Sequence, residues 1–131
     1  VRLNLLGNCF NNAGQFKKAV ECYKAAVPFL EELNDEYYIF YPLVSLVEAN
    51  LNLKNKYECE KYYLCLKGIK KVSTWRKAKF LQTEACYFSL IGDHESALKN
   101  LDECLENFEA EVESQKAYLY TIKLITLFKA G

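Results

Sequence analysis

The sequence predicts an all-α protein built from repeated antiparallel helical hairpins, with about seven helices in 131 residues. Hydrophobic residues make up 51% of the chain and aromatic residues 15%, which supplies a core and excludes a disordered chain. The 5 Gly and 2 Pro are too few for the many short turns of an all-β protein. A turn signal also recurs at intervals near 39 residues, at Gly14, Asn55, Gly92 and Gly131. Gly and Asn tolerate the left-handed conformation that often ends a helix.

The first predicted hairpin spans about residues 1–33. Its regularly spaced residues are Leu3, Leu6, Gly7, Phe10, Gly14, Ala19, Tyr23 and Ala26. Small residues at Gly7, Ala19 and Ala26 would let two helices cross closely, while large ones fill the gaps between hairpins. The spacing resembles the tetratricopeptide pattern W-x2-L-G-x2-Y…A-x3-F, with Leu3 and Tyr23 in the Trp and Phe positions. The resemblance, to a long-period variant of that family, implies an α-solenoid: a right-handed superhelix whose first helices line a concave groove.

Two further hairpins, at about 34–72 and 73–111, and a half-hairpin at 112–131 complete one predicted domain. The third hairpin repeats the core positions well, at Leu81, Ala85, Phe88, Ala97 and Leu101. The second is weaker, because Glu48 and Glu60 fall where small residues are expected. Either the alignment is wrong by one residue there, or the hairpin is degenerate.

The predicted helices cover 2–13, 16–33, 36–54, 56–72, 75–91, 94–110 and 113–129. We expect caps at Asn34-Asp35-Glu36 and at Ser73-Thr74, and a kink or a late start at Pro42. The last helix is apolar around much of its circumference, whereas a terminal cap should have a polar outer face. Together with the absence of Met, this predicts a piece of a longer protein, or a surface that docks or self-associates.

The charge balance argues against several classes of partner. Lys plus Arg equals Asp plus Glu, 17 against 17, so no overall field favours nucleic acid or an anionic membrane. No apolar run is long enough to span a bilayer. The six Cys show no compact pairing pattern, which predicts reduced thiols and a cytoplasmic or nuclear protein.

Charged residues nevertheless cluster along the chain. A basic run occupies 67–79, and it is either a site for an acidic peptide, a phosphate or RNA, or a solvated helix end, which we favour. The last third is acidic, with Asp102, Glu103, Glu106, Glu109, Glu111 and Glu113. A surface polarised in this way could set the orientation of a partner.

No pattern points to catalysis, a cofactor or a metal. The single His, His94, occupies the turn position of Phe16 and Tyr57, which is typical of a ring packed at a hairpin. Cys59 and Cys65 are six residues apart, so they point to different faces of a helix. The glycines are isolated and form no phosphate-binding loop. The sequence therefore predicts a protein that is not an enzyme and binds neither metal nor cofactor.

The candidate binding residues form a polar stripe that starts in the first helix. Asn4, Asn8 and Asn11 are four and three residues apart and share one helix face, with Asn12 beside them. In the family it resembles, residues at these places hold an extended peptide by its backbone. By alignment the stripe passes Ala49 and Cys86, and its predicted contact residues in the later helices are Ser45, Asn52, Lys79, Gln82, Ser89 and Thr121. The alternative is that these polar helix ends are merely solvated.

The leading functional hypothesis is an adaptor that binds a protein, as a peptide or a partner helix, in its concave groove. One alternative is a peptide-responsive sensor domain of a transcription regulator or signalling protein. Another is a structural subunit of a large complex, in which self-association through the apolar last helix would be expected.

Overall fold

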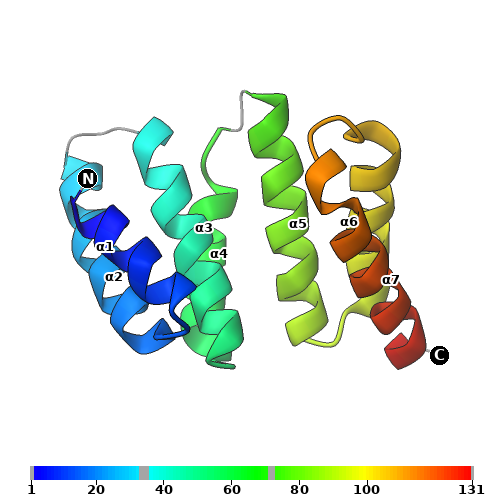
Figure 1. Ribbon diagram of the computed structural model, residues 1–131, viewed down its shortest axis with the longest axis horizontal. Helices are drawn as coiled ribbons and strands as arrows, with labels where there is room; N and C mark the ends of the chain where they lie inside the picture. Colours follow the sequence, from blue (N-terminus) through cyan, green and yellow to red (C-terminus); the bar gives the residue numbers. More distant parts are fainter. Residues whose placement is uncertain (1, 33–35, 71–72, 131) are drawn as a thin grey trace. The chain divides into compact units, whose positions relative to one another are not determined.

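The computed structural model describes residues 2–32, 36–70 and 73–130, where every regular element is a helix (Figure 1). The elements are α1 (Arg2–Asn12), α2 (Phe16–Glu32), α3 (Glu36–Asn52), α4 (Lys56–Lys67), α5 (Thr74–Leu90), α6 (His94–Asn107), the short 3-10 helix η1 (Glu113–Gln115) and α7 (Lys116–Ala130). The predictions of an all-α fold and of seven helices are therefore confirmed.

The chain divides into two compact units, Val1–Lys70 and Lys71–Gly131. Unit 1 holds α1 to α4, and α2 packs against both α1 and α3 while α3 also packs against α4. Unit 2 holds α5, α6, η1 and α7, with α6 packed between α5 and α7. Within each unit consecutive helices run antiparallel (Figure 1). The single solenoid domain and its superhelix involve both units together and stay a prediction.

Three helix boundaries differ from the predicted ones by three residues or more, and one of them is the end of α6, at Asn107 in place of 110. We predicted 56–72 for the fourth helix, but α4 ends at Lys67, where the N–H of Gly68 bonds to the carbonyls of Leu64 and Cys65. The last helix was expected from residue 113, yet 113–115 form the 3-10 turn η1 and α7 begins at Lys116. The late start at Pro42 is also wrong, because α3 begins at Glu36 and runs through Pro42, whose side chain is buried.

The caps can be compared at one of the two predicted places. Ser73 caps α5, since its hydroxyl accepts a hydrogen bond from the N–H of Arg76 at 3.2 Å, as predicted. The cap predicted at 34–36 and the turn residue Gly131 involve residues outside the described part of the chain.

Three hairpin turns share one backbone geometry. Gly14, Lys54 and Gly92 have φ values of 78°, 56° and 85°, in the left-handed region. In each turn this residue donates to the carbonyl three residues back, and the next residue donates to the carbonyl five back, as in Gly14–Asn11 and Gln15–Phe10. This pair of bonds is the Schellman motif, which satisfies the free carbonyls at a helix end. The hairpin repeat is thus present in the backbone itself.

The turn geometry corrects the predicted turn residue of the second hairpin. Asn55 has φ −92°, and its side chain accepts from the N–H of Glu58 at 3.2 Å, so it is the N-cap of α4. The left-handed residue is Lys54, one position earlier. An Asn was expected to adopt that conformation because its short side chain tolerates it, but it serves the next helix instead.

Counting from Lys54 restores the core pattern of the second hairpin. Three sets of equivalent positions are buried in all three hairpins: Ala19, Cys59 and Ala97; Tyr23, Tyr63 and Leu101; Ala26, Leu66 and Cys104. The small-residue positions belong to Val47 and Cys59, and Glu48 and Glu60 lie one residue beyond them. The one-residue alignment error is therefore the right alternative, and the hairpin is not degenerate.

Candidate binding surface

A buried tyrosine joins three helices of unit 1. Tyr23 of α2 is 1% exposed, and its ring lies against Gly7 of α1, where an added Cβ would come within 2.8 Å of Cε1. Its hydroxyl donates to Oδ1 of Asn8 on α1 at 2.5 Å and is also hydrogen-bonded to Ser45 on α3. The predicted site residues Asn8 and Ser45 are therefore brought together, through a side chain that the sequence pattern assigned to the core.

The electrostatic surroundings of Tyr23 favour its neutral form. Burial raises the pKa of Tyr23 above its ordinary value of 10.0. The hydrogen bond with Ser45 acts in the opposite direction, and the carboxylate of Glu48 raises the pKa further. The neutral hydroxyl of Tyr23 is thus held in place and orients Asn8 and Ser45. Glu48 of α3 lies close to this hydroxyl.

The corrected alignment changes which polar residues are equivalent on α1 and α3. Asn8 corresponds to Glu48 and Asn12 to Asn52, because each pair has the same separation from Gly14 or Lys54. Both helices therefore carry two polar side chains four residues apart, on one face. We call Asn8, Asn12, Glu48 and Asn52 the polar face of unit 1. Sequence reasoning missed Glu48, and the signal that would have found it was the turn position.

The other predicted residues of unit 1 lie beside this face. Asn11 is partly buried and its Oδ1 has no hydrogen-bond partner among the described residues. Asn52 is exposed and its Nδ2 donates to the carbonyl of Glu48 at 3.1 Å, within its own helix. Ser45 and Asn52 do not continue the stripe of Asn4 and Asn11 as predicted, since Val44 and Leu51 take those positions. Asn4 lies in α1, and its side chain is outside the described part.

The remaining predicted residues belong to unit 2. Lys79, Gln82 and Ser89 are partly buried on α5, and Oγ of Ser89 has no hydrogen-bond partner among the described residues. Thr121 is exposed on α7, and its hydroxyl donates to the carbonyl of Ala117 at 2.8 Å. The equivalents of Asn8 and Asn12 on α5 are Cys86 and Leu90, so the paired polar positions end with unit 1.

The candidates for other chemistry can also be placed. His94 is the first residue of α6 and is partly buried; its turn position is shared by Phe16 and Lys56, while Tyr57 is 77% exposed. All six cysteines are free thiols, and burial raises the pKa of Cys104 to about 12. In the described ranges no group of three His, Cys, Asp or Glu side chains could hold a metal ion. None of the helices described is long and apolar enough to cross a membrane.

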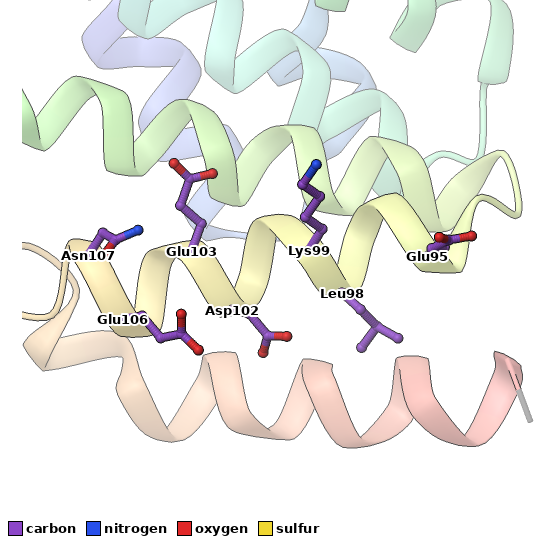
Figure 2. A pocket seen from close by; sticks show the side chains of 7 residues that line it. All are labelled: Glu95, Leu98, Lys99, Asp102, Glu103, Glu106 and Asn107. Carbon is purple, nitrogen blue, oxygen red and sulfur yellow. The ribbon is translucent and has the colours of Figure 1, made fainter.

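The charged clusters differ in how they are placed. The basic run includes residues on both sides of the unit boundary, and Arg76 within it is only 4% exposed, so it is no solvated residue. The acidic residues of α6 line an open depression of about 550 Å³ (Figure 2). Asp102 lies on the side of α7 and pairs with Lys123 at 2.6 Å, whereas Glu103 and Lys99 lie on the side of α5. One carboxylate is thus already neutralised within the unit.

A second depression, of about 410 Å³, lies in unit 1 between α2 and the turn from α3 to α4. Lys24 and Glu58 meet there at 3.4 Å. Asn50 also lines the depression and is buried, with its Nδ2 bonded to the carbonyl of Leu46 at 2.9 Å. The charges of the depression balance one another, so it offers no preference for a charged ligand.

The recurring turn and core positions define this chain as a helical-repeat protein of the all-α class. No family model matches its sequence, and neither the curated proteins nor the solved structures compared with it include a match. The resemblance to tetratricopeptide repeats consequently stays a prediction from the residues themselves.

Proposed function

We propose that the chain is a protein-interaction segment that holds an extended peptide of a partner along the polar face of unit 1. The observation that carries the proposal is the equivalence of Asn8 with Glu48 and of Asn12 with Asn52 on the first helices of two consecutive hairpins. Such repetition of polar side chains at matched places is what a ligand that contacts both hairpins of unit 1 requires.

The chemistry of these side chains suits a peptide backbone. An Asn amide provides two donors and an acceptor, and Glu48 adds acceptor oxygens, so together they complement both the N–H and the C=O groups of a strand. Side chains four apart on a helix are about 5–6 Å from one another, close to the roughly 6.6 Å between alternate residues of an extended chain. A peptide lying along α1 could therefore meet Asn8 and Asn12 with residues that point the same way.

The cost of asparagine in a helix also supports a functional role. Asn is a weaker helix former than Ala, and α1 carries four of them in 11 residues. Of the three whose side chains are described, Asn8 has a bond to another helix that accounts for its presence, through Tyr23. Helix stability alone would favour other residues at Asn11 and Asn12, so a surface that binds is the simpler explanation.

A display library of random peptides tests the proposal. Peptides selected on the 131-residue chain are titrated against it and against Asn12→Ala and Asn52→Ala variants. We expect each substitution to weaken binding about fivefold, since a lost hydrogen bond costs about 1 kcal/mol. Glu60→Ala, at an exposed position on α4, is the matched control and should bind as the unchanged chain does.

The outcome is decisive because both asparagines are exposed and Ala is the better helix former, so folding is preserved. Selection of no peptide above background, or affinities that stay within twofold in both Asn variants, would refute the proposed site.

A further inference from the structure

One side of α7 presents a continuous apolar surface. Leu119 and Thr126 are buried, and α7 packs against α6. Successive residues are about 100° apart around a helix, so the side of α7 opposite Leu119 and Thr126 carries a different set of residues. The exposed set comprises Ala117, Tyr120, Thr121, Leu124, Ile125, Leu127 and Phe128, which we call the α7 face. Phe128 is 89% exposed, an unusual state for a large ring at the centre of such a surface.

The α7 face carries no charge. Lys116 is paired with Glu109 and Glu113, and Lys123 with Asp102, all within unit 2. Lys129 is exposed at the edge of the face, about 40° around the helix from Ile125 and about 100° from Phe128 at its centre. In a two-fold symmetric interface both copies use the same surface. Charges of one sign on that surface would therefore face each other and repel. A charge-free face meets that condition, whereas it offers nothing to a partner that is recognised by charge.

The exposed apolar area is close to what a dimer needs. A covered aromatic ring buries about 150–250 Å², so Tyr120 at 52% and Phe128 at 89% offer about 280 Å². Leu124, Ile125 and Leu127 add about 150 Å², given about 60–120 Å² for a whole aliphatic side chain. A standard interface takes about 800 Å² per partner, about 65% of it apolar in homodimers. The α7 face therefore supplies most of the apolar area required.

The sizes of the side chains match when two copies of α7 lie antiparallel. If Phe128 of one copy is placed over Ala117 of the other, the same register places Leu124 over Thr121 and Tyr120 over Ile125. Large residues then meet small ones near both ends of the contact, which is how helices approach closely. Thr121 enters the interface without an unsatisfied donor, because its hydroxyl is already bonded to the carbonyl of Ala117 at 2.8 Å.

We infer that the α7 face binds a second copy of this chain and forms a two-fold symmetric, antiparallel helix pair with Phe128 seated on Ala117. Dimer formation would join two copies of the polar face of unit 1. A partner that binds two linked copies gains avidity over one that binds a single copy. The inference stands independently of the peptide site, because the two surfaces share no residue.

The test is the mass of the 131-residue chain by analytical ultracentrifugation across a dilution series. The dimer should sediment at twice the chain mass of 15.2 kDa and dissociate on dilution. Phe128→Ala should weaken the dimer at least tenfold, because it removes the most exposed ring of the α7 face. Tyr57→Ala, at a residue of unit 1 that is 77% exposed, should leave the dissociation constant unchanged.

A size exchange tests the register. Ala117→Phe alone should abolish the dimer by placing ring against ring, and the double variant Ala117→Phe, Phe128→Ala should restore it. Circular dichroism checks that each variant keeps its helices. A chain that stays monomeric at every concentration would overturn the inference and leave the face to another protein or to a longer form of the chain. A dimer that survives Phe128→Ala, or a double variant that stays monomeric, would also overturn it.

Discussion

The ring of Tyr23 lies so close to Gly7 that a Cβ on residue 7 would come within 2.8 Å of its Cε1 atom. The absence of a side chain at Gly7 lets α2 place Tyr23 against α1, where its hydroxyl reaches Asn8. Packing within the first hairpin and orientation of the polar face thus depend on the same contact.

Gly7→Ala should destabilise the chain. Moving the buried Tyr23 ring costs about 1–3 kcal/mol, and the better helix propensity of Ala returns up to about 1 kcal/mol, so a net loss of about 1–2 kcal/mol is expected in urea unfolding. Gly68→Ala is the control, because a Cβ there makes only an ordinary contact, 3.5 Å from the carbonyl oxygen of Cys65. Equal stabilities for the two variants would contradict the close packing of Tyr23.

Tyr23→Phe should keep the ring packing and lose the hydroxyl. Without its bonds to Asn8 and Ser45, the free energy of unfolding should fall by about 1–2 kcal/mol. In a double-mutant cycle with Asn8→Ala, a coupling of about 1 kcal/mol is expected between the two positions. Additive effects would show that the Tyr23 hydroxyl does not hold Asn8.

Lys54→Gly should stabilise the chain. A left-handed conformation costs a non-glycine residue about 1–2 kcal/mol, and the greater freedom of Gly in the unfolded chain offsets about 0.4–1 kcal/mol of the gain. We expect the free energy of unfolding to rise by about 0.5–1 kcal/mol. Gly14→Ala, at the equivalent turn, should have the opposite sign, although nothing lies within 4 Å of the added Cβ. A destabilised Lys54→Gly variant would refute the corrected turn assignment.

Cys104 should make the chain less stable in alkali. In the unfolded chain its thiol ionises near pH 9.0, whereas burial raises its pKa to about 12 in the folded chain. The folded state therefore keeps a proton that the unfolded state loses, and stability falls as the pH rises from 9 towards 12.

The Cys104→Ala variant measures this contribution, since Ala26 occupies the equivalent core position in the first hairpin. Its stability should fall less than that of the unchanged chain between pH 8 and pH 10, by up to about 1 kcal/mol. The pKa values of Tyr23 and Tyr62 are also raised, but these residues contribute equally to the pH dependence of both proteins. If the stabilities of the two proteins fell equally with pH, Cys104 would have the same pKa in the folded and the unfolded chain, which would contradict this prediction.

The sequence was sufficient to predict the seven helices and two of the three turns. The two turns could be predicted because Gly14 and Gly92 mark left-handed positions that few other residues tolerate. The turn at Lys54 was misplaced, since a lysine in that conformation gives no sequence signal and the neighbouring Asn55 gives a false one. Because the turn was misplaced by one residue, the predicted polar stripe was also shifted by one residue on α3. It passed through Ala49 in place of Glu48. The role of Tyr23 was hidden for another reason: a buried aromatic residue in a core pattern does not reveal where its hydroxyl points.

The most direct measurement of the functional account is where a selected peptide contacts the chain, observed as changes in backbone amide resonances on titration. Binding along the polar face of unit 1 predicts that the largest changes fall in α1 from Asn8 to Asn12 and in α3 from Glu48 to Asn52, and that both sets saturate at one dissociation constant. Changes centred on α4, or confined to unit 2, would contradict it.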